Sequence, residues 1–401
     1  MYTIRAVPDL YWDPYDAEIE RDPYDVWRRM RDEAPVYRND DLDFYALTRF
    51  ADVEAAHRDP QTFSSARGTV LEIMGPDLSR TGQMIFLDPP EHTSLRHLVS
   101  RAFTPRRVTQ LEARVRELCA ELLDPFAGAP ELDYVADFGD HLPSMVISSL
   151  LGLPREDQRE VRRMVDGIFH IEPGVGIVNE TSINAGIDVA GYVGGELAKR
   201  RTTPGDDLLT ALVEAEITDD EGVVRRMTEQ ETIEFTMLLF IAGTETVGRL
   251  LGWAAVVLAD NPDQRKELAA DPALLPDAVE ELLRYEAPSG IQGRWTMRDV
   301  QLHDTVIPQD AKVLLVTAAA GRDERAYPDP DRFDIHRTAQ PHVSFGYGIH
   351  FCLGAALARL EGRVALEETL KRFPEWQVDH ARAERLHTST VRGYTKVPIL
   401  V

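Results

Sequence analysis

The chain has 401 residues, of which 44 are Lys or Arg and 68 are Asp or Glu, so its formal net charge is −24. A protein this acidic repels phosphate backbones, which argues against nucleic acid as a partner. Its two cysteines exclude a disulfide framework, and its N-terminus lacks the apolar core of a signal peptide. We therefore expect a soluble, cytoplasmic protein with no membrane anchor. No linker, low-complexity tract or internal repeat divides the sequence, which favours one large, mainly α-helical domain over residues 1–401.

Two elements are predicted in the first quarter of the chain. The segments 36–38 and 44–48 are rich in β-prone residues and flank a turn-forming Asn-Asp-Asp, so they predict a β-hairpin. Residues 88–107 predict a helix that begins with a capping aspartate and two prolines. On this helix His92 and Arg96 lie four residues apart on one face, where they either bind a carboxylate or form an ordinary surface pair.

The middle of the chain predicts one long, buried helix over residues 228–259. Thr228 and Glu231 form a capping box at its start, and apolar residues cover nearly all of its faces. Its centre, 242–246, reads Ala-Gly-Thr-Glu-Thr, where a glycine and a buried acid both cost free energy. From the residues alone, this centre is either a kink with a satisfied polar cluster or a functional site. The irregular stretch 171–186 before it is expected to join two helices or to cap a pocket.

The last predicted elements are small-sheet strands over 300–307 and 313–316, followed by a cysteine loop. Cys352 lies among glycines, directly before a helix pattern that begins at Leu353. The positive end of a helix dipole favours the thiolate form of such a cysteine. A buried, inert cysteine is the alternative. A zinc site lacks ligands, and a dinucleotide loop lacks its third glycine, since Phe351 stands there.

Residues 345–354 read Phe-Gly-Tyr-Gly-Ile-His-Phe-Cys-Leu-Gly. This loop closely resembles the haem-binding signature of the cytochrome P-450 family, and every fixed position matches. The resemblance implies a mainly α fold with small β-sheets around a buried haem b (iron protoporphyrin IX), with Cys352 as the thiolate ligand of the iron. Phe345 and Gly346 of the same loop would also contact the haem. A monooxygenase of this kind inserts one atom of O₂ into a hydrophobic small molecule.

The same resemblance assigns roles to other motifs. The centre of the long helix is similar to the family's Ala-Gly-x-Asp/Glu-Thr motif, which begins at Ala242 and in which Gly243 would open a groove for O₂. Thr246 would hold a hydrogen-bonded water there, and Glu245 would relay protons from solvent. The haem propionates would be bound by His92, Arg96, Arg294 and His342, and His350 would either join them or brace the cysteine loop. A Glu-x-x-Arg helix and the loop after it would brace the fold through Glu281, Arg284 and Arg332.

Electrons must come from another protein, because the sequence has no Rossmann, P-loop or flavodoxin pattern and too few cysteines for an iron–sulfur cluster. The resemblance implies a small ferredoxin and a flavin-dependent ferredoxin reductase that draws on NAD(P)H. The protein itself is expected to be a monomer. Five arginines on the cysteine side are either a docking patch or ordinary solvated side chains: Arg101, Arg106, Arg107, Arg359 and Arg363.

The substrate pocket is expected to be mostly apolar, which suits a hydrophobic small molecule. By family position its lining comprises Met74, Met84, Ile85, Phe169, Ile171, Leu239, Ala242, Ile291 and Val391, with His170 and Gln292 placed to orient a polar group. A peroxide-driven peroxygenase is the first alternative function, and the acid–threonine pair at 245–246 argues against it. A haem sensor or binding protein is the second, and the sequence leaves no room for an output domain.

Overall fold

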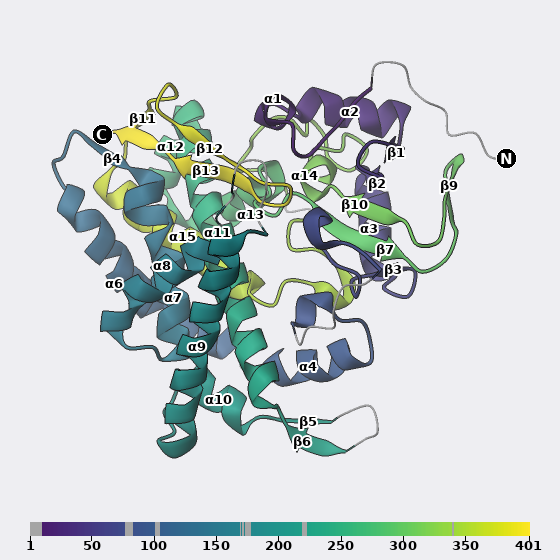
Figure 1. Ribbon diagram of the computed structural model, residues 1–401. Coiled ribbons are helices and arrows are strands. Elements are labelled where there is room, and N and C mark those ends of the chain that lie inside the picture. Colours follow the sequence, from purple (N-terminus) through teal and green to yellow (C-terminus); the bar gives the residue numbers. More distant parts are fainter. Residues whose placement is uncertain are drawn as a thin grey trace.

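The structure is a computed structural model that describes residues 10–76, 83–100, 105–168, 170, 172, 178–218, 223–338 and 341–401. Most of these residues are helical and the strands form small sheets, which confirms the predicted fold class (Figure 1). Helices fill one side of the molecule, and the largest sheet lies on the other side with the first two helices above it (Figure 1).

The helices account for most of the described chain. In order they are α1 (Ala17–Arg21), α2 (Tyr24–Glu33), α3 (Phe50–Arg58), α4 (Glu91–Ser100), α5 (Pro105–Gln110), α6 (Glu112–Leu123), α7 (His141–Leu151), α8 (Gln158–Ile168), α9 (Glu180–Thr202), α10 (Leu208–Glu214), α11 (Glu229–Asp260), α12 (Pro262–Ala270), α13 (Leu275–Tyr285), α14 (Thr317–Ala320) and α15 (Ala355–Arg372). A π-helical turn, Tyr134–Gly139, leads into α7.

Helix α11 organises the core. Thr228 and Glu231 form the predicted capping box at its start. One large apolar cluster surrounds its second half, together with α6, α7, α13 and α15, and another surrounds its first half, together with α8, α9 and α10. Among the described residues it is the one helix long and apolar enough to cross a membrane, but 78% of its most apolar window is buried inside the fold. Its apolar surface is therefore used for packing within the protein.

The largest sheet has the strand order β1-β2-β10-β7-β3. Strands β1 (Val36–Asn39) and β2 (Phe44–Leu47) form the predicted antiparallel hairpin. Strand β10 (Lys312–Leu315) pairs in parallel with β2 and antiparallel with β7 (Gln292–Thr296), which in turn pairs with β3 (Phe63–Ser64). Two apolar clusters cover this sheet, so β7 and its Arg294 are held firmly against the rest of the fold.

The remaining strands form short pairs at the periphery. The segment predicted as a strand over 300–307 is a hairpin of β8 (Val300–Leu302) and β9 (Thr305–Ile307), because the chain turns at His303 with a positive φ. The other pairings join β12 (Glu384–His387) to β13 (Arg392–Lys396), β5 (Glu216–Thr218) to β6 (Val224–Arg226), and β14 (Pro398–Leu400) to both β4 (Glu131–Asp133) and β11 (Gln377–Val378).

The segments 88–107 and 171–186 match the sequence predictions only in part. Of the helix predicted over 88–107, residues 91–100 (α4) and 105–107 (in α5) are helical, and residues 101–104 lie outside the described part of the chain. The Asp88 carboxylate accepts hydrogen bonds from the Ser64 hydroxyl and the Ser65 N–H, and its carbonyl accepts from the His92 N–H of α4. Within the segment left irregular, residues from 180 onward are helical, because Asn179 supplies a capping box that the sequence reading overlooked.

Candidate functional site

The cysteine loop turns tightly against helix α3. Gly346 and Gly348 have φ values of +66° and +67°, which residues with a side chain rarely adopt. A Cβ on Gly348 would lie 2.5 Å from the carbonyl oxygen of His57, so glycine is required for this close approach. The N–H of Cys352 donates to the carbonyl of Phe345 at 2.9 Å and closes the loop. The glycines therefore fix the loop on α3.

The sulfur of Cys352 lies in a setting that disfavours the bare thiolate. Burial raises the pKa of the thiol, and this effect outweighs the Gly354 N–H and the nearby charges of Arg96 and Arg359. The N–H at the start of α15 favours the thiolate, as the sequence predicts, but in the protein alone burial has the larger effect. Among the described residues, no group of three or more His, Cys, Asp or Glu side chains is arranged to hold a metal ion. A metal bound to this sulfur would supply the positive charge that its thiolate form requires.

Five cationic or potentially cationic side chains converge beside this loop from four segments of the chain. Helix α4 contributes His92 and Arg96, β7 contributes Arg294, the loop contributes His350, and α3 contributes His57. The rings of His92 and His350 lie 4.3 Å apart between centroids. Nη2 of Arg294 lies 3.3 Å from Nδ1 of His57. We call these five residues the cationic cluster.

The cationic cluster has unused hydrogen-bonding capacity. Nε2 of His57, both ring nitrogens of His92 and Nε2 of His350 are buried and have no hydrogen-bond partner among the described residues. Buried polar atoms in native proteins nearly always have a partner, so these nitrogens indicate a ligand with several acceptor oxygens. Haem, with its two propionate groups, provides such acceptors.

The electrostatics of the cluster also favour an anion. Burial and then the charge of Arg96 lower the pKa of His92 to about 4. Burial, followed by the repulsion of Arg294 and the other cluster members, lowers the pKa of His350 to about 2. Arg294 is buried as well, and its pKa falls to about 10 although Asp88 opposes the shift. Burial is the largest cause of each shift, and nearby carboxylates would oppose it by favouring the charged form of each group.

His57 was missed by the sequence analysis. It lies at the end of α3 next to Arg58 and resembles an ordinary surface histidine in the sequence, yet it is 3% exposed. Burial, followed by the charge of Arg294, lowers its pKa well below the ordinary value. No local pattern marks it; only the packing of α3 against β7 and the cysteine loop brings it to the cluster.

His342 does not join the cationic cluster. Its Nε2 lies 3.2 Å from a carboxylate oxygen of Glu280, and its Nδ1 accepts a hydrogen bond from the Ser344 N–H. Arg359 donates two hydrogen bonds to the same Glu280 carboxylate and lies over the Phe345 ring. Burial opposes ionisation of Glu280, but the hydrogen bonds from Arg359 and His342 lower its pKa to about 2. Both nitrogens of His342 are thus engaged in a brace behind the cysteine loop.

The centre of α11 has one open face. Ala242 is exposed and Thr246, one turn later, is partly exposed, whereas Thr244 and Glu245 between them are buried. The Thr246 hydroxyl donates to the Ala242 carbonyl at 2.9 Å. The hydroxyl of the buried Thr244 makes the same kind of bond to Phe240 on another face. The open face can therefore present the Thr246 hydroxyl to a bound molecule.

Gly243 and Glu245 point away from the open face. A Cβ on Gly243 would lie 3.5 Å from Ile147 of α7, which is an ordinary packing distance. Glu245 is buried and its carboxylate accepts from Arg249 at 2.8 Å. Arg249 also donates to the carbonyl of Tyr394 on β13. The acid expected to relay protons is therefore held in a buried ion pair.

The bracing network has a different third member from the one predicted. Glu281 and Arg284 pair at 2.7 Å as expected. The second arginine on Glu281 is Arg337, at 3.1 Å, and not Arg332. The Arg332 side chain is 70% exposed and lies 3.7 Å from Asp334, while its carbonyl accepts from Arg284 and Arg337.

We expect Arg284→Ala to lower the free energy of unfolding by about 3–5 kcal/mol, because it leaves a buried carboxylate only partly compensated. The matched control is Arg332→Ala in the same network, for which we expect a change within about 0.5 kcal/mol. Urea unfolding monitored by circular dichroism measures both. Equal losses in the two variants would contradict the assignment of Arg337 as the third member.

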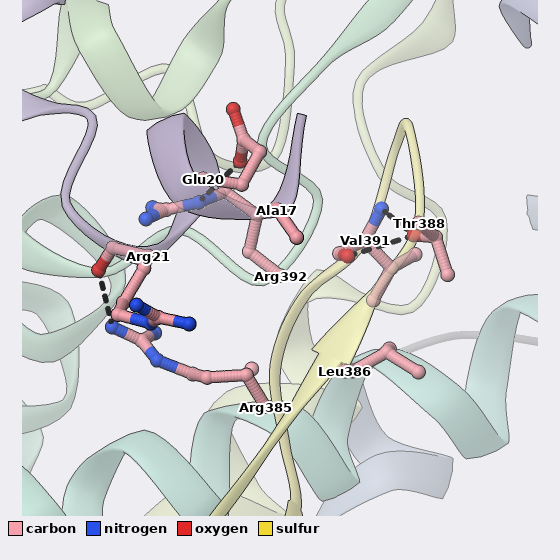
Figure 2. A pocket seen from close by; sticks show the side chains of 9 residues that line it. Ala17, Glu20, Arg21, Arg385, Leu386, Thr388, Val391 and Arg392 are labelled. Carbon is pink, nitrogen blue, oxygen red and sulfur yellow. Dashed lines mark hydrogen bonds and ion pairs between the residues drawn. The ribbon is translucent and has the colours of Figure 1, made fainter. Parts of the chain in front are cut away.

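The residues expected to line one substrate pocket differ in burial and location. Met74, Met84, Leu239 and Ile291 are buried, and Ile85 is exposed. Phe169 and Ile171 lie outside the described residues. Val391 lines a separate cavity of about 140 Å³ between α1 and the β12–β13 hairpin, together with Arg385 and Arg392 (Figure 2). His170 is exposed, and the amide oxygen of Gln292 lies near the cysteine loop at Gly346.

The arginines considered for docking are already paired where they are described. Arg359 binds Glu280, and Arg363 binds Glu112 at 2.7 Å. Arg101 and the side chains of Arg106 and Arg107 lie outside the described residues. Any acidic partner at Arg359 or Arg363 would have to compete with these internal carboxylates.

Comparison with known proteins gives the same assignment as the site. The family model for cytochrome P450 matches residues 195–398. The chain is 40% identical over 397 residues to putative cytochrome P450 123 of Mycobacterium tuberculosis (strain ATCC 25618 / H37Rv), covering 98% of each protein. It is 37% identical over 395 residues to vitamin D(3) 25-hydroxylase of Pseudonocardia autotrophica, covering 96% of each. The structure of cytochrome P450 CYP109Q5 from Chondromyces apiculatus matches with a TM-score of 0.88 at 34% identity, covering 97% of each chain.

A haem-thiolate enzyme needs a cysteine loop, a group of donors for the haem propionates and an open face on the far side of the haem. The cysteine loop, the cationic cluster and the open face of α11 match these three requirements. The similarity to these relatives extends over nearly the whole chain. The chain belongs to the cytochrome P450 family and is a monooxygenase that oxidises small hydrophobic molecules.

Proposed function

We propose that residues 1–401 form a single monooxygenase domain that binds haem b through the sulfur of Cys352. The propionates would be held by the cationic cluster of His57, His92, Arg96, Arg294 and His350. The observation that carries this proposal is the set of buried ring nitrogens without partners in that cluster. Phe345 and Gly346 shape the loop that carries the sulfur, whereas His342 serves the brace around Glu280.

When bound, the haem supplies the redox-active iron at which O₂ is activated. The net reaction consumes O₂, two electrons and two protons; one oxygen atom enters the substrate and the other leaves as water. Thr246 holds a water molecule on the open face of α11 and directs a proton toward the reaction site. Glu245 takes that proton from solvent and passes it on. Ala242 and Gly243 keep the helix narrow at this point.

Electrons come from NAD(P)H through a flavin-dependent ferredoxin reductase and a small ferredoxin. The ferredoxin would dock on the face that carries Arg359 and Arg363, near the exposed ring of Phe351. The enzyme works as a soluble, cytoplasmic monomer. The burial of α11 inside the fold supports the absence of a membrane-spanning role for this helix.

The substrate is an apolar molecule bound between the open face of α11 and the buried side chains of Met74, Met84, Leu239 and Ile291. A relative named vitamin D(3) 25-hydroxylase supports a sterol-like compound as a first candidate. Such compounds present few polar groups and match an apolar lining.

The test of the proposed function is spectroscopic. We expect the purified protein to carry haem and to give, after reduction and addition of carbon monoxide, the absorption of a thiolate-ligated iron. Sterol-like compounds are then titrated against the oxidised protein, and a bound substrate changes the spin state of the iron. A colourless protein, or an absorption typical of imidazole ligation, would refute the proposal.

A further inference from the structure

A ladder of alternating charges leads from the buried Glu245 toward the protein surface. Arg249 on α11 lies 2.8 Å from Glu245 and 3.4 Å from Asp140, the residue that joins the π-helical turn to α7. Asp140 lies 3.8 Å from Arg162 of α8, which pairs at 2.6 Å with Asp166. The side chain of Asp166 is 51% exposed. The ladder is the run Glu245, Arg249, Asp140, Arg162 and Asp166.

The backbone around Asp140 is shaped to reach α11. A Cβ on Gly248 would lie 3.1 Å from both Oδ1 of Asp140 and the carbonyl oxygen of Gly139. One turn later, a Cβ on Gly252 would lie 2.9 Å from a methyl group of Val135. These two glycines let the π-helical turn approach α11 closely enough for Asp140 to contact Arg249. Turns of this kind occur often at functional sites.

Two carboxylates therefore share one guanidinium. Nε and Nη2 of Arg249 pair with the Glu245 carboxylate. Nη1 of Arg249 donates to the Tyr394 carbonyl and forms an ion pair with Asp140. Burial raises the pKa of Asp140 to about 6, and the charges of Glu245 and Asp166 add to this effect against those of Arg249 and Arg162. The ionisation of Asp140 and the charge on Glu245 are thus coupled.

We propose that Asp140 is a positioning residue for proton delivery. When ionised, Asp140 competes with Glu245 for the positive charge of Arg249, and the weaker attraction between Arg249 and Glu245 lets Glu245 accept a proton from solvent. Glu245 then gains one proton, passes it through the water held by Thr246 toward the oxygen atom that leaves as water, and returns to a carboxylate. The residue is therefore unchanged over a cycle. This inference rests on the proposed function.

The direction of the effect follows from the charges that face Asp140, namely Arg249 and Glu245 on α11 and Arg162 and Asp166 on α8. When Asp140 is neutral, the whole charge of Arg249 stabilises the Glu245 carboxylate, and protonation of Glu245 costs more free energy. Proton delivery should therefore be efficient above about pH 6 and should weaken as the pH falls below it, since Asp140 gains its proton there.

The first test measures the coupling without turnover. Infrared difference spectra of the oxidised protein labelled with carbon-13 aspartate should show a carboxyl group that titrates near pH 6. This band should be absent in Asp140→Asn. In Glu245→Gln its midpoint should move to lower pH, because a neighbouring negative charge has been removed. A band that persists in Asp140→Asn, or a midpoint that Glu245→Gln leaves unchanged, would overturn the inference.

The second test measures turnover with the redox partners. Asp140→Asn should lower the rate about fivefold, enlarge the solvent isotope effect and abolish the pH dependence between about pH 5 and 7. Haem content and substrate affinity should stay unchanged. The matched control is Asp137→Asn in the same π-helical turn, whose carboxylate accepts from the Asp133 N–H at 2.9 Å outside the ladder. This control should retain the wild-type pH profile.

The outcomes separate the inference from the proposed function. If the protein is not a monooxygenase, neither variant turns over, whereas the carboxyl titration and its response to Glu245→Gln are still seen. If only the role of Asp140 is wrong, Asp140→Asn turns over with the rate, isotope effect and pH profile of the wild type.

Discussion

Replacing Cys352 by alanine removes the thiolate-type carbon monoxide absorption and lowers monooxygenase activity by about a hundredfold or more, to background. The thiolate is the one protein ligand expected on the iron, and its electron donation is what favours cleavage of the O–O bond. Absorption spectra of the reduced, carbon monoxide-treated protein and product formation with redox partners measure the effect. Haem content is measured in parallel, since the cationic cluster can still hold part of it through the propionates.

The matched control for this experiment is the other cysteine of the chain. Cys119 on α6 is fully buried in the large apolar cluster, and burial raises the pKa of its thiol. Cys119→Ala removes a small core side chain and should keep both the absorption and the activity, with a stability loss of about 1 kcal/mol. A Cys352→Ala protein that keeps the thiolate-type absorption would contradict the ligand assignment.

Replacing Thr246 by alanine uncouples electron consumption from product formation. The hydroxyl of Thr246 lies on the open face of α11, where it can hold a water molecule beside the bound O₂. Without this hydroxyl, protons are no longer directed to the oxygen atom that must leave as water, and a larger share of the supplied electrons ends in hydrogen peroxide. We expect the product formed per pair of electrons to fall about tenfold while haem binding is unchanged. Parallel assays of peroxide and product measure this ratio.

Thr244→Ala is the control for Thr246→Ala. Thr244 is two residues away on the same helix, and its hydroxyl makes the same kind of bond, to the carbonyl of Phe240 at 2.7 Å. It is 1% exposed and faces the packed side of α11. We expect its coupling ratio to equal that of the wild type. If both variants lose coupling equally, the effect comes from the helix backbone and not from a hydroxyl on the open face.

Features encoded by neighbouring residues were predictable from the sequence. The capping box of Thr228 and Glu231, the hairpin of β1 and β2, and the positive φ angles of Gly346 and Gly348 in the cysteine loop are all local features. Their signals therefore survive in a linear sequence. The family resemblance assigned His92, Arg96 and Arg294 to the haem propionates, and the fold brings all three close to His350 from α4 and β7.

Features that join distant segments were missed or misassigned. His57 reaches the cationic cluster only because α3 packs against the cysteine loop. Asp140 meets Arg249 only because two glycines let the π-helical turn approach α11. His342 and Arg332 were assigned by motif position, but the nearest carboxylates and carbonyls decided their partners.

The sequence by itself determined the chemistry of this protein: a cysteine in a loop shaped for haem, an acid and a threonine in the middle of a buried helix, and a charge that repels nucleic acid. The tertiary structure decided which charges surround these groups and how strongly water is excluded from them. Burial and long-range pairing set the pKa of Cys352, His350 and Asp140. Burial and long-range pairing cannot be read from a residue and its neighbours in the chain, because both depend on the side chains that folding brings around that residue.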